Sequence, residues 1–177
     1  HSHHGITLKS IITSYKLMNY SFPQKFWLVA LRIAIGWHFL YEGLAKITNA
    51  NWSSVGYLLD SEGFLKDFFV NTLAGNPNML QVIDFLNIWG LILIGLGLIL
   101  GSFERIATIS GILLLVLYYL SHPPFVGLKY AVPSEGSYLV VNKILIEMIA
   151  LAVVFVFPTN REFGLDRFIF GPAKIKK

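Results

Sequence analysis

The sequence predicts an all-α fold: a transmembrane four-helix bundle with an N-terminal interfacial helix and an apolar outer loop. Of the 177 residues, 55% are hydrophobic and only 14% are charged, and the mean hydropathy is +0.62. A soluble domain has about 25% charged residues, so this chain has too few charges to cover a soluble core of its size. We therefore expect a lipid bilayer to be the solvent for much of its surface.

Four apolar stretches are predicted to form the transmembrane helices. A helix needs about 20 residues to cross a hydrocarbon core roughly 30 Å thick. The stretches cover residues 26–47, 79–100, 106–120 and 138–157. Gly101 and Ser102 give a tight turn between the second and third, and prolines, which end helices, follow the third and fourth. Residues 26–157 are thus predicted to form one four-helix transmembrane domain.

The segments around this domain are predicted to lie at the membrane surface. Residues 1–25 repeat apolar side chains at helical spacing with lysines between them, which favours an amphipathic helix in the headgroup layer. Residues 158–177 form a short basic tail. The loop at 49–76 is apolar enough to lie along the outer interface.

The distribution of lysine and arginine predicts the orientation. Nine of them lie in the N-terminal arm, the connection between the second and third helices, and the tail, against two in the other loops. Positive residues are retained on the cytoplasmic side of a membrane. We expect a multi-pass protein of a bacterial inner membrane with both termini in the cytoplasm.

Ionisable residues inside the spans are the main functional signal. Each costs about 2.5–3.5 kcal/mol at the bilayer centre, so we expect these side chains to face inward and find partners. At about 1.5 Å of rise per residue, groups from all four helices fall at matching depths in the outer half of the bundle. This predicted polar column comprises His38, Glu42, Lys46, Asp84, His122, Lys143 and Glu147. In the inner half, Arg32 is expected to pair with Glu104 or a lipid phosphate.

Several kinds of site are not expected. The chain has no cysteine, which excludes disulfides, thiolate metal sites and thiol nucleophiles. It has no zinc-protease motif, phosphate loop or nucleotide fingerprint, and its basic ends flank spans, as anchors to anionic lipids do. His38 and His122 differ in depth by about 13 Å, too far for one haem. We expect no metal, no haem and no nucleic acid partner.

The stretch from Leu31 to Lys46 resembles the first helix of the DoxX family of small four-helix membrane proteins. The shared pattern is an arginine, a glycine four residues on, a phenylalanine, a second glycine and a terminal lysine. In this chain they are Arg32, Gly36, Phe39, Gly43 and Lys46. The glycine-rich second helix, followed by Glu104-Arg105, and the fourth helix from Tyr138 through Glu147 are also similar. The resemblance covers roughly residues 27–157.

The resemblance implies a role beside the quinone pool, because the family's namesakes are subunits of a thiosulfate:quinone oxidoreductase. We expect a membrane oxidoreductase subunit that passes electrons from an outer-face donor or partner enzyme to a quinone. His38, Glu42 and Glu147 would supply protons from the polar column. The residues expected to bind the quinone are Arg32, Trp37, Lys46, Asp84, Trp89, Tyr118, His122 and Lys143.

The partners expected are membrane lipids, the quinone and a soluble oxidoreductase docked on the apolar loop at 52–69. Nothing in the sequence supports thiosulfate as the substrate. The alternative hypothesis is a non-redox membrane module that anchors, gates or transports a small solute, whose buried charges are structural. A buried polar column fits either class, because it can hold helices in register or form a path for protons or a ligand.

Overall fold

The computed structural model describes residues 20–131 and 139–172, and it confirms the all-α prediction for them. No β-strand occurs in these two ranges. The elements are α2 (Phe22–Ile47), α3 (Val55–Leu59), the π-helix η1 (Phe68–Ala74), α4 (Pro77–Leu100), α5 (Glu104–Ser121), α6 (Lys143–Val156) and α7 (Asp166–Phe170). The predicted interfacial helix falls mostly on residues 1–19, outside the described residues.

The helices begin where the sequence provides donors and acceptors for their free ends. Ser21 forms a capping box with Gln24 at the start of α2, with a proline in the first turn. The side chain of Asn76 accepts hydrogen bonds from two backbone amides at the start of α4, and Asn142 does the same for one amide of α6. Gly101 ends α4 in the left-handed conformation (φ 61°), which lets α5 fold back beside it.

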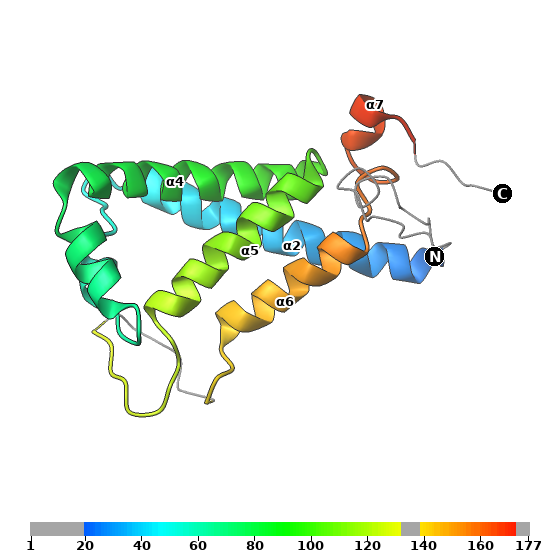
Figure 1. The fold of residues 1–177 in the computed structure, drawn as a ribbon. Coiled ribbons are helices and arrows are strands. Elements are labelled where there is room, and N and C mark those ends of the chain that lie inside the picture. Colours follow the sequence, from blue (N-terminus) through cyan, green and yellow to red (C-terminus); the bar gives the residue numbers. More distant parts are fainter. Residues whose placement is uncertain (1–19, 132–138, 173–177) are drawn as a thin grey trace, which may run out of the picture.

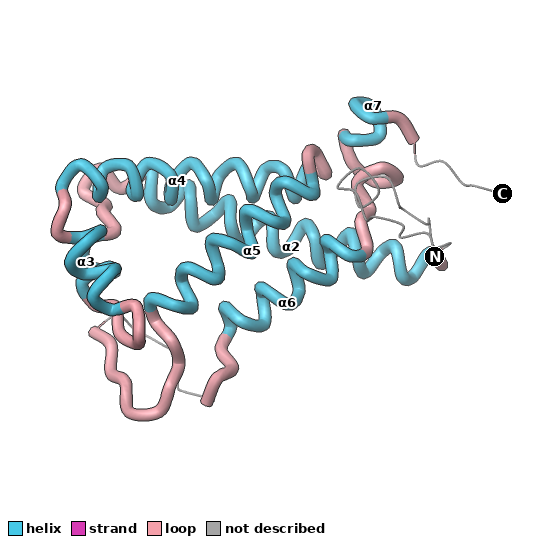
Figure 2. The backbone as a smooth tube through the Cα atoms, viewed as in Figure 1, coloured by secondary structure: helices cyan, strands magenta, loops and turns pink. Residues whose placement is uncertain are grey.

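Within residues 20–131 and 139–172, three helices, α2, α4 and α5, are long and apolar enough to cross a membrane. α6 has 14 residues, so it is only about 21 Å long. Its start is fixed by the Asn142 cap, five residues later than the start of the predicted span. The chain is therefore a multi-pass membrane protein, and the fourth span stays a prediction. Figure 2 shows the tight connection between α4 and α5 and the longer loop that follows α5.

The bundle consists of two helix pairs. α2 lies along α4, and α5 lies along α6 (Figure 1). The pairs diverge toward the end where η1 and the connection after α5 lie, here termed the loop side; the opposite end, where residues 157–170 lie, is termed the tail side. At the centre the four helices share one apolar core. It contains Ile35, Phe39, Leu91, Ile94, Leu98, Ala107, Leu115, Leu151 and Val154.

Glycines allow the close approach of α2 and α4. A Cβ atom at Gly95 would lie 2.5 Å from the backbone nitrogen of Leu40 and 2.7 Å from the carbonyl oxygen of Gly36. A Cβ atom at Gly43 would lie 2.7 Å from the side chain of Ile92. Small residues at such contacts let transmembrane helices pack by van der Waals contact of their backbones.

We expect Gly95→Ala to destabilise the protein by about 1–3 kcal/mol, because the new methyl group would separate the α2 and α4 backbones. Gly90→Ala, on the same helix, is the matched control, since a Cβ atom there has nothing within 4 Å. Unfolding by sodium dodecyl sulfate in mixed micelles measures the free energy of unfolding of each variant. Equal loss of stability in both variants would contradict this account of the α2–α4 contact.

Candidate functional site

A histidine–carboxylate dyad joins α2 to α6 within the bundle. His38 Nδ1 lies 2.7 Å from Glu147 Oε1, and the side chains are 52% and 15% exposed. The sequence predicts the same depth for these two residues, and the structure brings them together. With Glu147 ionised, Nδ1 carries the hydrogen that it donates, so Nε2 remains as the ring nitrogen that can accept a proton. The arrangement can therefore exchange protons.

Two helical turns further along α2, Lys46 links three elements. Its Nζ donates to Asn87 Oδ1 of α4 at 2.8 Å, and Asn87 Nδ2 donates to the hydroxyl of Tyr118 of α5 at 2.7 Å. The Trp52 ring from the loop lies 5.0 Å from Nζ, within range of a cation–π interaction. Lys46 and Tyr118 were predicted from the sequence as site residues, Trp52 was predicted only as part of the docking loop, and Asn87 was missed. The signal that could have identified Asn87 is the presence of an amide side chain within an apolar span.

Glu42 lies between these two groups on the same stripe of α2. Residues four apart on a helix share one face, and the neighbours of Glu42 on this stripe, His38 and Lys46, bond to α6 and α4 respectively. The side chain of Glu42 is exposed, and its charge acts on His38, Lys46 and Tyr118. Lys143, at the start of α6, also acts on His38. These groups form the part of the predicted polar column that the structure assembles.

Asp84 does not join this column. Its carboxylate accepts hydrogen bonds from Ser53 Oγ at 2.8 Å, from the Ser54 backbone amide at 2.8 Å, and from Ser54 Oγ. The loop after α2 folds back over α4 and supplies these donors. Depth along a helix does not show which way a side chain points around it, so the prediction could not separate Asp84 from the column.

His122 is also elsewhere, in an aromatic cluster beyond the end of α5. Its ring stacks on Tyr57 with a centroid distance of 3.9 Å, lies 4.8 Å from Tyr130, and places Nε2 3.5 Å from Asp60 Oδ2. Burial lowers the pKa of His122, against the opposing charges of Asp60 and Glu62. The cluster fastens α3 and the loop after α5 to each other.

The two tryptophans expected to wall a quinone ring lie on outward faces. Trp37 is 59% exposed and Trp89 is 43% exposed. Each ring packs against the aromatic residue one turn away on its own helix, Tyr41 for Trp37 and Phe85 for Trp89. Within the described residues, neither ring has an aromatic contact with the dyad. The structure therefore places both side chains toward the lipid.

Arg32 lies in a separate, fully buried cluster on the tail side. It pairs with Glu104 at 3.6 Å, the partner that the sequence suggested, and donates to Thr159 Oγ1 at 2.9 Å and to the Phe163 carbonyl at 2.5 Å. Both charged side chains are about 1% exposed. Asp166 completes the cluster by accepting from the Phe103 amide at 2.8 Å. The cluster fixes residues 157–170 against the helix ends and leaves Arg32 without a surface for a ligand.

The comparison with protein families agrees with this architecture. The DoxX family model matches residues 27–123, more than half of the chain. The chain belongs to the DoxX family. Searches of the curated proteins and of the solved structures found no significant match. The family match covers α2 through α5, including His38 and Lys46, and ends before α6, which carries Glu147.

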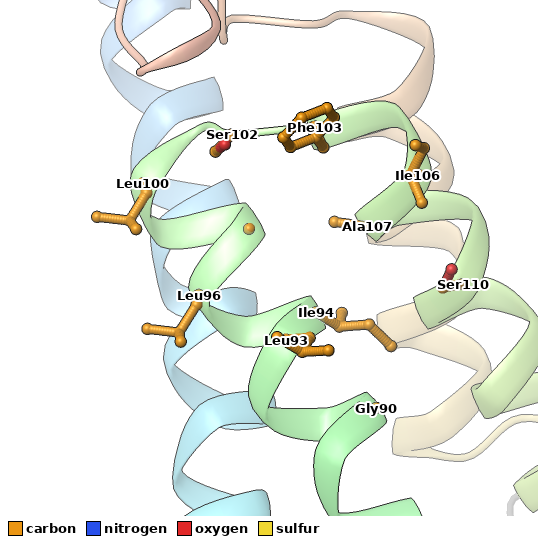
Figure 3. Close-up of a pocket in the computed structure, with 11 residues that line it drawn as sticks. Gly90, Leu93, Ile94, Leu96, Leu100, Ser102, Phe103, Ile106, Ala107 and Ser110 are labelled. Carbon is orange, nitrogen blue, oxygen red and sulfur yellow. The ribbon is translucent and has the colours of Figure 1, made fainter. Parts of the chain in front are cut away.

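This DoxX protein also has an apolar pocket of about 450 Å³ between α4 and α5. Gly90 leaves room on α4, and Phe103 and Ile106 border the space near the turn (Figure 3). Only two of the lining residues, Ser102 and Ser110, have a polar side chain. The pocket suits a hydrocarbon chain rather than a reacting group. Among the described residues, no group of three or more His, Cys, Asp or Glu side chains could hold a metal ion.

Removal of the buried arginine is expected to be costly. Arg32→Met would leave Glu104 and Asp166 buried without their cation, and breaking such a pair costs about 3–5 kcal/mol. Lys25→Met is the control, because the Lys25–Glu162 pair is partly exposed and such pairs contribute about 0–1 kcal/mol. Thermal unfolding in detergent compares the variants. The double variant Arg32→Met, Glu104→Met should recover part of the loss.

The loop-side aromatic cluster is expected to lose stability in acid. The folded pKa of His122 lies below the value of 6.5 of a free histidine, so the unfolded state binds more protons between the two values. Stability is then full above about pH 6.5 and falls as the pH decreases through the folded pKa. His122→Phe keeps a ring for stacking and should flatten this dependence. The measurement is the Tm of the wild type and of the variant between pH 8 and pH 5. Identical pH profiles of the two Tm values would contradict the role given to His122.

Proposed function

We propose that this DoxX protein is a subunit of a quinone-linked membrane oxidoreductase, in which the His38–Glu147 dyad transfers protons at the quinone site. Reduction of a quinone takes two electrons and two protons and gives a quinol. The observation that carries the proposal is the 2.7 Å contact of a half-exposed histidine with a carboxylate inside a membrane bundle. Ionisable groups at this depth are costly and mark paths for protons or ligands.

The residues around the dyad fit the head group of a quinone. Its two carbonyl oxygens need hydrogen-bond donors, and its ring needs an apolar or aromatic wall. The His38 ring can donate from protonated Nε2, and Lys46 has N–H groups beyond the one given to Asn87. The Tyr118 ring lies 5.7 Å from Lys46 Nζ and offers an aromatic face. Glu42 and Lys143 add the charges that can replenish or stabilise a proton on the dyad.

Electrons would come from a soluble oxidoreductase that docks on the loop side. Exposed apolar side chains of the loop support such a contact, above all Phe64, which is 78% exposed, and Leu59, which is 54% exposed. Aromatic and aliphatic residues of this kind form the centres of protein interfaces. The sequence has nine lysines and arginines in the N-terminal arm, the connection between α4 and α5, and the tail, against two in the other loops. On this count the proposed outer face, of a bacterial inner membrane, is the loop side.

Quinone binding tests this proposal. Ubiquinone-1 and menadione are titrated into the purified protein and followed by isothermal calorimetry, and bound quinone is extracted from membranes for mass spectrometry. His38→Asn and Glu147→Gln should each weaken binding by about tenfold, the equivalent of one lost charged hydrogen bond of roughly 1.5 kcal/mol. Glu62→Gln, which removes a partly exposed carboxylate of the loop that pairs with Lys66, should bind as the wild type does.

Absence of both co-purified quinone and measurable binding by the wild type would refute the proposal. The second candidate function, a non-redox membrane module, is favoured by the Arg32–Glu104 cluster, whose buried charges are paired inside the protein. If the dyad has only that structural role, His38→Asn and Glu147→Gln will lower the Tm and have no effect on any ligand.

A further inference from the structure

The dyad has very different surroundings on its two sides. Toward the tail side, the next side chains that the helices bury are apolar: Ile35 on α2, Leu98 on α4, and Leu151 and Val154 on α6. Their exposed fractions are 6%, 0%, 0% and 2%. They belong to one contiguous core to which all four helices contribute. Close-packed apolar cores of this kind exclude water.

Polar groups beyond that layer do not open it. The Arg32–Glu104 pair is about 1% exposed and Asp166 is 2% exposed. Their partners are other groups of the same cluster, such as Thr159 and Asn160. Thr108, which is fully buried, donates its hydroxyl to the carbonyl oxygen of Glu104 one turn away. A proton on the tail side therefore meets a closed polar cluster and then an apolar layer.

Toward the loop side, the apolar core continues through Leu91 and Leu115, but ionisable groups run beside it on α2 and α6. Glu42 lies one turn beyond His38 and is exposed, and Lys46 lies one turn further. Lys143, one turn before Glu147, holds the corresponding place on α6. The charged groups that act on His38 are thus Glu147 and Lys143 from α6 and Glu42 from α2. Glu42 and Lys143 are exposed and Lys46 is partly exposed, so the protein leaves these groups uncovered. In this direction α5 and α6 also diverge from α2 and α4 (Figure 1).

We propose that the His38–Glu147 dyad is open to water only from the loop side, through Glu42, and exchanges its protons with that side of the membrane. The use of these protons in quinone chemistry rests on the proposed function, whereas the access path does not. Protons consumed or released at the dyad then enter or leave the compartment that α3 and η1 face. The tail-side compartment supplies none.

The absence of cysteine from the chain makes the access path measurable with single-cysteine variants of the full-length protein in sealed liposomes. Glu42→Cys is the test position. Asp67→Cys and Arg161→Cys, both exposed, mark the loop-side and tail-side compartments. A membrane-impermeant charged methanethiosulfonate reagent is added outside the liposomes or trapped inside them. Only a thiol in contact with water ionises and reacts at an appreciable rate.

Two further positions separate water from lipid and from the core. Tyr41→Cys lies beside Glu42 at almost the same depth but on the outward face of α2, where Tyr41 is 61% exposed. Ala107→Cys places a thiol in the apolar core, where Ala107 is 7% exposed. We expect Glu42→Cys to react with reagent in the loop-side compartment, where Asp67→Cys is labelled. Its rate should be about tenfold or more above that of Tyr41→Cys. Ala107→Cys should react from neither side.

Three results would show that the proposal is wrong. Glu42→Cys could react with reagent in the tail-side compartment, where Arg161→Cys is labelled, or equally with reagent in either compartment. It could also react no faster than Tyr41→Cys. If Glu42→Cys fails to fold, as judged by gel filtration in detergent, His38→Cys is read by the same criteria. Labelling needs no quinone, so one-sided labelling without quinone binding would uphold the access path and reject the proposed function. Quinone binding together with labelling from the tail side would uphold the proposed function and reject the access path.

Discussion

An ionisable side chain inside a bilayer must be neutralised or hydrogen-bonded by the protein itself, because the lipid offers neither water nor counterions. The structure meets this constraint in two ways. On the tail side, Arg32, Glu104 and Asp166 are buried and bonded to one another and to nearby backbone. Nearer the loop side, His38 pairs with Glu147 and Lys46 with Asn87, but these groups keep partial exposure. The first arrangement fixes helix ends, and the second leaves protons exchangeable.

The packing of the helices determines where each kind of site can exist. Glycines bring α2 and α4 into backbone contact, as the short Gly95–Leu40 approach shows. α5 and α6 form the other pair and meet the first pair in the apolar core, where Leu98 and Leu151 are fully buried. From there the pairs diverge toward the loop side. The same small bundle thus holds a buried charge cluster on the tail side and a half-exposed dyad nearer the loop side.

The loop between α2 and α4 supplies hydrogen-bond donors and aromatic contacts to the polar groups of the bundle. Ser53 and Ser54 satisfy Asp84, and Trp52 packs over Lys46. Tyr57 reaches across to stack on His122 at the end of α5. The segment between α2 and α4 therefore folds over the bundle end and takes part in the polar network. The DoxX family match includes this whole segment, whereas Glu147 of the dyad lies on a helix beyond the match.

The sequence by itself determined the all-α class, three of the spans and the family, because hydrophobic length and helix-ending residues act locally along the chain. It also placed His38 and Glu147 at the same depth and named Glu104 as one of two partners for Arg32, since the depth of a residue in a span follows from counting along a helix. Only the tertiary structure decided which way each side chain points around its helix. That direction separated Asp84 and His122 from the column, turned Trp37 and Trp89 toward lipid, and brought in Asn87. The rotation of a helix about its axis is set by contacts with its neighbours, such as the glycine contact of α2 with α4. These contacts cannot be derived from residue positions along one helix.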